Sequence, residues 1–305
     1  MTRVAIAGSG DVARYFTEEL VRAGHEVVIL MRSHKPQSTG PGTSQFVTDY
    51  SLESVSKAIV DCDVLISTIL DYSMDLVDVH LTLIEACKKS PKCKRFIPSE
   101  YGADLERHPD QPAFYYANHE PVRKALRDQT EIEWTLVCVG WLMDYIVPSR
   151  NRYLKDIGGA FPIDLGSGTA EIPGPGDLPF NLTAARDVAK AIAALVSAPA
   201  QSWETLTFVS GDQTTWKDLV SVMQTRIPGL QVTHKSLDQL KEAARSAGDD
   251  WARLVAEYQI FSAGDAGSLN PEKVRRHREK YFGHIHFRTV PEVLQAAEEN
   301  PQAIV

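Results

Sequence analysis

A glycine-rich turn near the start of the chain constrains the fold most strongly. The run Gly8-Ser9-Gly10-Asp11-Val12-Ala13 directly follows the apolar stretch at residues 4–7 and precedes apolar residues at helical spacing. This strand, turn and helix fit G-x-G-x-x-A, a form of the dinucleotide-binding motif. The first glycine allows a tight turn, the second lets the backbone approach a pyrophosphate, and the small Ala13 lets the helix pack on the strand. We therefore predict a dinucleotide site formed by Gly8, Ser9, Gly10, Asp11 and Val12.

Strands and helices are expected to alternate through the first half of the chain. The first helix should end at Gly24, and Pro121 is compatible with a helix only in its first turn. This alternation predicts an α/β fold with a Rossmann-type doubly wound parallel sheet. The expected strands are 4–7, 27–31, 46–47, 64–69, 95–97 and 134–139, and the expected helices are 12–21, 52–60, 76–87 and 121–127.

The pattern changes after about residue 145. Glycines and the stretch Pro173-Gly174-Pro175-Gly176 interrupt the alternation, before expected helices at 184–197 and 216–226 and a short strand at 205–209. We find no internal repeat. We predict a dinucleotide-binding domain at residues 1–147 and a smaller C-terminal α+β substrate lobe at residues 148–305, partly interleaved with the first domain.

The end of the second expected strand indicates which dinucleotide binds. NAD-selective sites carry Asp or Glu about 20 residues after the glycine motif, where it binds the ribose 2′-hydroxyl. Here Arg32-Ser33-His34-Lys35 follows the strand, so two cations and a hydroxyl lie where a 2′-phosphate would bind. We predict NADP(H) as the cofactor, bound by Arg32, Ser33 and Lys35. A solvated basic loop is the alternative interpretation.

Composition excludes several other classes of protein. The 305 residues carry a net charge of −8 without a basic stripe, which argues against nucleic acid as a partner. No stretch approaches the apolar length of a membrane helix, and no signal peptide is evident, so we expect a cytoplasmic protein without membrane contact. The four cysteines and the pair His284 and His286 lack metal-ligand spacing, so no metal site is predicted. A homodimer is compatible with the sequence, which does not decide the oligomeric state.

The segment Phe96-Ile97-Pro98-Ser99-Glu100-Tyr101-Gly102, together with the glycine turn and Arg32, resembles the NmrA-like and isoflavone-reductase-like group of atypical short-chain dehydrogenases/reductases. Thr68, Val122-Arg123, residues 140–145 and Arg186-Asp187-Val188-Ala189 support the resemblance. It implies NADPH across the carboxyl edge of the sheet and hydride transfer to an aromatic or polycyclic small molecule of secondary metabolism. The implied further cofactor-binding residues are Ser67, Thr68, Ile69, Pro98, Glu100 and Tyr101.

The chain departs from this group at the catalytic position. Reductases of the group carry a lysine four residues before the Arg of the Val-Arg pair, and here that position is His119. Tyr115 lies four residues earlier, which reproduces the Y-x-x-x-K spacing of ordinary short-chain dehydrogenases with histidine in place of lysine. We expect Tyr115 or His119 to handle the proton, His119 to hydrogen-bond the ribose, and Ser99 to be a second donor. Alternatively, Tyr115 packs in the core and His119 is an ordinary buried polar residue.

An aromatic segment follows the last expected strand. Trp141, Met143 and Tyr145 would suit a flat substrate, although core packing explains them almost as well. The preferred function is an NADPH-dependent reductase. The alternatives are a redox-responsive regulator that binds NADP(H) without turnover, which the group includes among its fungal members, and a redox-neutral cyclisation catalyst that retains the cofactor.

Overall fold

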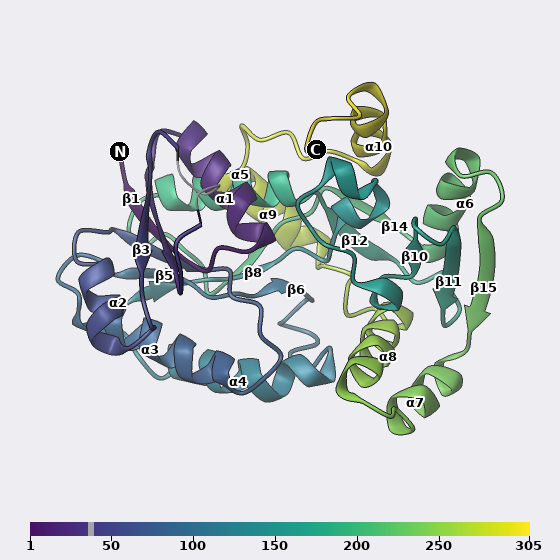
Figure 1. The fold of residues 1–305 in the computed structure, drawn as a ribbon, viewed down its shortest axis with the longest axis horizontal. Helices are drawn as coiled ribbons and strands as arrows, with labels where there is room; N and C mark the ends of the chain where they lie inside the picture. The colour runs from purple at the N-terminus through teal and green to yellow at the C-terminus, as the bar shows by residue number, and fades with distance from the viewer. Residues whose placement is uncertain (36–39) are drawn as a thin grey trace.

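A six-stranded parallel sheet forms the centre of the N-terminal half of the computed structural model, which describes residues 1–35 and 40–305 (Figure 1). The strand order is β3-β2-β1-β4-β5-β7, and each neighbouring pair is parallel. The order reverses between β1 and β4, and ligands of doubly wound sheets bind at such a switch point. This confirms the predicted Rossmann-type α/β fold. The strands are β1 (Arg3–Ala7), β2 (Glu26–Met31), β3 (Thr43–Val47), β4 (Val64–Ser67), β5 (Arg95–Ile97) and β7 (Glu133–Trp134).

Helices cover both faces of this sheet (Figure 1). Val4 and Ile6 of β1 point to one face, where they pack with α1 (Asp11–Arg22) and α5 (Ala185–Ser197). Ala5 and Ala7 point to the other face, because side chains alternate along a strand. That face is covered by α2 (Leu52–Ala58), α3 (Asp75–Lys89) and α4 (Ala113–Arg127). The C-terminal half thus supplies α5 to the core of the sheet.

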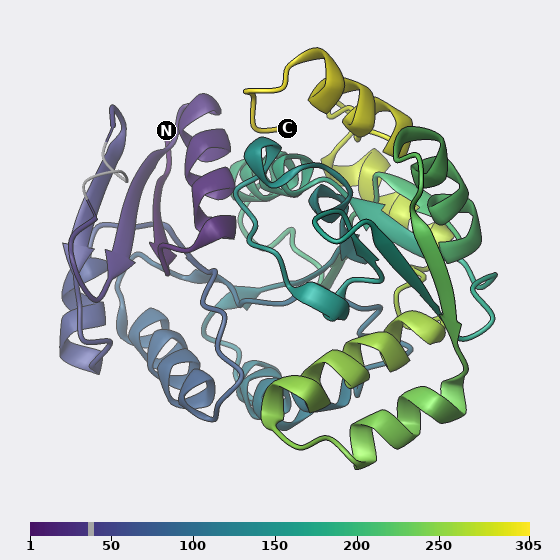
Figure 2. The ribbon, with the colours of Figure 1, turned by 45° about the vertical axis from the view of Figure 1, so that its right-hand side comes forward.

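The C-terminal half contains small sheets and further helices around a second core. Figure 2 shows α7 and α8 side by side at the edge of the molecule. Trp216, Phe180 and Trp141 are large aromatic residues of this core. The elements not yet named, of which β6, β8 and β9 precede residue 148, are β6 (Tyr101–Gly102), β8 (Leu136–Cys138), β9 (Trp141–Leu142), β10 (Ile163–Asp164), β11 (Thr169–Pro173), β12 (Phe180–Thr183), β13 (Leu206–Phe208), β14 (Asp212–Thr214), β15 (Gln231–Lys235), α6 (Trp216–Arg226), α7 (Leu237–Arg245), α8 (Asp250–Ala263), α9 (Pro271–Tyr281) and α10 (Val290–Glu299).

Two predicted element boundaries are wrong. Helix α4 begins at Ala113, so Pro121 lies in its interior and not in its first turn. The helix continues through the proline because Asn118, His119, Val122 and other side chains of one face are buried, and tertiary packing outweighs local propensity. The expected strand at 134–139 is divided into β7, which pairs with β5, and β8, which pairs with β6 and β13.

Candidate functional site

A cavity of about 770 Å³ lies at the carboxyl ends of β1, β2, β4 and β5 and extends to α4, β9 and α8. Most of the predicted site residues line it. Four do not: Ser67, Pro98, His119 and Met143 are buried behind the wall. The predicted residues that line the cavity are Gly8, Ser9, Gly10, Asp11, Val12, Arg32, Ser33, Lys35, Thr68, Ile69, Ser99, Glu100, Tyr101, Tyr115, Trp141 and Tyr145.

The glycine turn has the geometry that its motif requires. Gly8 has a φ of +107°, and a Cβ atom there would lie 2.8 Å from Thr68 Oγ1. Gly10 has no atom within 4 Å of its Cβ position, so the space in front of it is open. Gly10 is the N-cap of α1 and makes no side-chain capping hydrogen bond. The exposed N-cap of this helix, which carries no side chain, fits the phosphate groups of a dinucleotide.

Two cations lie beside this turn, at the end of β2. Arg32 is exposed on the cavity, and its guanidinium pairs with no carboxylate among residues 1–35 and 40–305. Its guanidinium carbon lies 6.0 Å from the centre of the Tyr50 ring. The Lys35 ammonium donates to the carbonyl of Ser9 at 3.3 Å, and Lys35 and Asp11 both line the cavity. The arrangement fits a phosphate on the adenosine ribose.

A buried ion pair joins the segment after β5 to α4. Arg123 donates to both carboxylate oxygens of Glu100, at 2.6 Å and 2.9 Å, and both side chains are about 95 % buried or more. Burial lowers the pKa of Arg123, but the Glu100 carboxylate outweighs it and the pKa is raised. Glu100 is therefore occupied by a cation and is not a free base. Sequence reasoning included Arg123 only as part of the Val-Arg pair and missed its contact with Glu100.

Two tyrosines meet on the cavity wall. Tyr258 of α8 donates its hydroxyl proton to the hydroxyl oxygen of Tyr115 at 3.2 Å. Burial raises the pKa of both phenols, so both are protonated at neutral pH. Because Tyr115 accepts from Tyr258, its own proton is available to another acceptor. Tyr258 was not predicted, and no local motif marks it, since 143 positions separate it from Tyr115.

His119 lies one helical turn from Tyr115, and their ring centres are 4.5 Å apart. Its Nδ1 lies 2.6 Å from Asn118 Oδ1 and 3.1 Å from the Tyr115 carbonyl oxygen, so Nδ1 carries the proton. Burial lowers the pKa of His119, although Glu100 partly offsets this. The imidazole is therefore neutral at neutral pH. With 3 % of its surface exposed, it does not replace the steady cation of a lysine.

Asn118 connects His119 to the loop after β4. Its Nδ2 donates to the carbonyl oxygens of Asp71 and Ser73, at 3.2 Å each, while its Oδ1 accepts from His119. Asp71 and the neighbouring Tyr72 line the cavity. Asn118 and His119, both on α4, thus fix the loop at Asp71 and Ser73 to this helix. That loop forms part of the cavity wall.

The far end of the cavity is aromatic. The Trp141 ring lies 5.5 Å from Tyr258 and 5.7 Å from Phe261, measured between ring centres. Tyr145 follows Trp141 in the chain and also lines the cavity, whereas Met143 between them is fully buried in the second core. The aromatic residues that line the whole cavity are Tyr50, Tyr72, Tyr101, Tyr115, Trp141, Tyr145, Tyr258 and Phe261.

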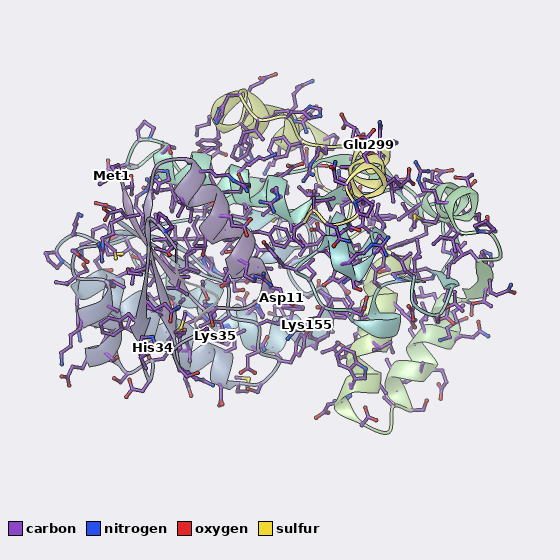
Figure 3. All side chains as sticks on the ribbon, turned by 45° about the horizontal axis from the view of Figure 1, so that its top comes forward. Met1, Asp11, His34, Lys35, Lys155 and Glu299 are labelled. Carbon is purple, nitrogen blue, oxygen red and sulfur yellow. The ribbon has the colours of Figure 1, made fainter. Side chains whose placement is uncertain are left out.

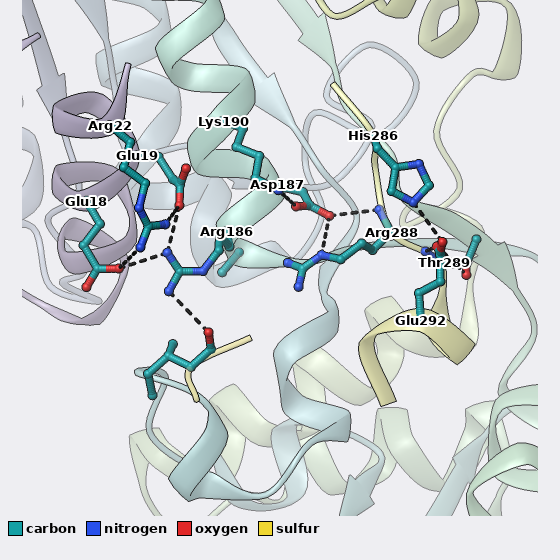
Figure 4. Close-up of polar contacts among 12 residues, drawn as sticks. Glu18, Glu19, Arg22, Arg186, Asp187, Lys190, His286, Arg288, Thr289 and Glu292 are labelled. Carbon is teal, nitrogen blue, oxygen red and sulfur yellow. Dashed lines mark hydrogen bonds and ion pairs between the residues drawn. The ribbon is translucent and has the colours of Figure 1, made fainter. Parts of the chain in front are cut away.

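The segment Arg186-Asp187-Val188-Ala189 has a structural role outside the cavity (Figure 4). Arg186 of α5 donates to Glu18 at 2.9 Å and to Glu19 at 2.8 Å, both on α1. The fully buried Asp187 accepts from Arg288 at 3.0 Å. These ion pairs fix α5 to the helix that begins at the glycine turn.

Across residues 1–35 and 40–305 there is no group of three His, Cys, Asp or Glu side chains placed to hold a metal ion. Within the same ranges every helix is too short or too polar to cross a bilayer. His284 and His286 lie in an irregular segment and not on a strand, and His286 Nε2 lies 2.8 Å from Glu292 (Figure 4).

Comparisons with known proteins agree with this geometry. Residues 2–259 match the NmrA-like family. The oxidoreductase swnR of Arthroderma benhamiae is 49 % identical over 304 residues, which cover 99 % of this chain and 100 % of the relative. The crystal structure of isoflavone reductase has a TM-score of 0.71 at 18 % identity, covering 97 % of this chain and 99 % of the other. The binary complex of leucoanthocyanidin reductase and NADPH from Vitis vinifera has a TM-score of 0.73 at 22 % identity, covering 95 % and 97 %.

NADPH, the cofactor of the complex from Vitis vinifera, is also the one predicted here from the glycine turn and Arg32. The two solved structures, each with less than a quarter of its residues identical to this chain, share its fold. The match over residues 2–259 confirms the resemblance drawn from the segment at residues 96–102. The chain belongs to the NmrA-like family.

Proposed function

We propose that the protein is an NADPH-dependent reductase that transfers hydride to a small aromatic or polycyclic metabolite. The observation that carries this proposal is one continuous cavity, which joins the glycine turn to an aromatic wall. A dinucleotide and a flat organic molecule would lie in direct contact there. The name of the relative from Arthroderma benhamiae, an oxidoreductase, supports the reaction class, and the NADPH complex from Vitis vinifera supports the cofactor.

The cofactor would be held by the N-terminal half. The backbone from Gly8 to Val12 would bind the phosphates linking the two nucleosides, and Arg32 with Ser33 would bind the 2′-phosphate. When bound, NADPH supplies the hydride. Thr68 and Ile69, at the end of β4, would contact the part of the cofactor beyond the phosphates.

Tyr115 would supply the proton or hydrogen bond that the reduced substrate needs. Its hydroxyl accepts from Tyr258, so its own proton is free to reach a developing oxyanion in the cavity. Ser99 lines the same cavity and would be a second donor. His119 would act as a positioning residue, because it holds Asn118 and does not reach the wall.

The substrate would bind against Trp141, Tyr145 and Tyr258, whose rings offer flat apolar faces, with a hydroxyl group at the edge of each tyrosine. Residues 148–305 would form the substrate lobe. The domain boundary at residue 147, the cytoplasmic location, the homodimer and the absence of nucleic acid as a partner stay predictions from the sequence.

A second candidate function is NADP(H) binding without reduction, as in a redox-responsive regulator or a redox-neutral cyclisation catalyst. It is favoured by the surroundings of Tyr115. Among the described residues, two basic groups on α4 lie nearest to Tyr115. His119 is neutral, and the charge of Arg123 is paired with Glu100. The pKa of Tyr115 is raised by burial and not lowered by a cation, which makes the phenol a weaker acid.

Turnover of NADPH separates the two candidates. The wild-type protein is incubated with NADPH and a panel of aromatic ketones, enones and imines, and loss of NADPH fluorescence is followed. A reductase oxidises NADPH with at least one panel member. Tyr115→Phe should then lower kcat by about a hundredfold or more while the Kd of NADPH stays unchanged. Tight binding of NADPH without oxidation by any panel member would favour the second candidate.

A further inference from the structure

A segment of the C-terminal half lies against the helix that starts at the glycine turn. The backbone N–H of Tyr153 donates to the hydroxyl of Tyr15 at 2.9 Å, and the Arg14 guanidinium carbon lies 3.6 Å from the centre of the Tyr153 ring. Two residues on, the backbone N–H of Lys155 donates to Asp11 Oδ2 at 3.1 Å. The segment is therefore fixed at the first residue of α1, next to the predicted phosphate site.

Arg152 holds this segment in shape. Its guanidinium is buried and donates to the carbonyl oxygens of Val147 at 3.1 Å and Leu154 at 2.6 Å. Leu154, Lys155 and Ile157 then line the same cavity as the glycine turn. The hydrogen bond from the Lys155 N–H to Asp11 and the bond from Arg152 to Leu154 thus set the position of Lys155 at the cavity.

The Asp11 carboxylate adds a negative charge at the place where a negatively charged diphosphate would bind. The Asp11 carboxylate lies at the start of α1, where it would repel the phosphates that the helix N-terminus attracts. The Lys155 side chain is exposed, and its ammonium pairs with no carboxylate in the described ranges. Figure 3 shows Lys155 next to Asp11, with Lys35 nearby. An ammonium here would offset the Asp11 charge and bind a phosphate oxygen.

We propose that Lys155, from the C-terminal half, binds the diphosphate that links the two nucleosides of the cofactor. This inference rests on the proposed function, because it assumes that a dinucleotide occupies the cavity. It assigns separate roles to two cations: Arg32 recognises the 2′-phosphate of NADPH alone, whereas Lys155 recognises a group that NADPH and NADH share. The two residues should therefore differ in their effect on cofactor preference.

Titrations of purified variants with NADPH and with NADH test the assignment. Lys155→Met should raise both dissociation constants by a similar factor of about ten, and should weaken their dependence on salt. Lys155→Arg should keep most of the affinity. Arg32→Met should raise the dissociation constant of NADPH only. Lys241→Met, at an exposed lysine of α7, is the matched control and should change neither.

Three outcomes would overturn the assignment. Unchanged affinities in Lys155→Met would show that the ammonium does not contact the cofactor. A loss for NADPH alone would place it on the 2′-phosphate. Failure of the wild-type protein to bind either dinucleotide would refute the proposed function and this inference together. Because Lys155 is exposed, its variants should unfold at the wild-type temperature, and a thermal melt checks this.

Discussion

Replacing Gly10 with alanine should weaken the binding of the cofactor without lowering the stability of the fold. Gly10 has a φ of −82°, which alanine adopts without strain, and no atom lies within 4 Å of the added methyl group. The free energy of unfolding should therefore stay the same or rise by up to about 1 kcal/mol. The methyl group would instead occupy the space where the backbone approaches the cofactor phosphates.

The expected loss of affinity follows from overpacking. Forcing an extra methyl group into a close contact costs about 1–3 kcal/mol, which corresponds to an increase of about 5-fold to 150-fold in the Kd of NADPH. Gly8→Ala should behave differently. Its φ of +107° is strained for alanine, and the new Cβ would lie 2.8 Å from Thr68 Oγ1 and 3.2 Å from the Thr68 carbonyl carbon. That variant should lose about 1–3 kcal/mol of stability from the backbone strain alone.

Both variants can be measured with the same two assays. Urea denaturation gives the free energy of unfolding, and fluorescence titration gives the Kd of NADPH. Gly10→Ala with wild-type stability and weakened NADPH binding is the predicted result. Wild-type affinity in Gly10→Ala would refute the placement of the phosphates at this turn. A loss of stability in that variant would refute the steric reasoning.

Three further predictions concern buried polar groups. Burial lowers the pKa of His80 from 6.5 to about 4. Below pH 6.5 the unfolded chain gains a proton at this histidine that the folded chain does not gain. The free energy of unfolding should therefore fall by about 3 kcal/mol as the pH drops towards 4. Urea denaturation across this range should show a flatter dependence in His80→Leu. Arg123→Met leaves Glu100 buried and unpaired, so it should lower the free energy of unfolding by about 3–5 kcal/mol. The double variant Arg123→Met with Glu100→Gln should recover part of this loss. Additive losses in a double-mutant cycle would contradict the prediction. His119→Gln should lower kcat by less than about tenfold without changing its pH profile, because the imidazole is neutral and buried; a loss of a hundredfold would show that the ring transfers the proton.

The first β-α-β unit could be predicted because its signals are local. The buried run before Gly8, the glycine spacing and the apolar periodicity of α1 each depend on a few neighbouring residues. The basic residue Arg32 is also local to the end of β2, and the structure places it on the cavity. Patterns of this kind indicate fold class without knowledge of distant contacts.

The start of α4 and the partners of the candidate catalytic residues could not be predicted in this way. Pro121 indicates the start of a helix by local rules, whereas the burial of Asn118 and His119 on one face extends the helix to Ala113. The contact between Tyr115 and Tyr258 depends on how α8 of the C-terminal half packs on α4. The seclusion of His119 from the cavity likewise depends on tertiary packing, which its spacing from Tyr115 does not encode.

The central claim is that this cavity binds NADP(H) in preference to NAD(H). The most direct measurement is the dissociation constant of the wild-type protein for NADPH and for NADH, determined by fluorescence titration in the same buffer. Because Arg32 can make charge-assisted bonds to the 2′-phosphate, NADPH should bind about tenfold tighter or more. Equal affinity, a preference for NADH, or no binding of either dinucleotide would contradict the claim.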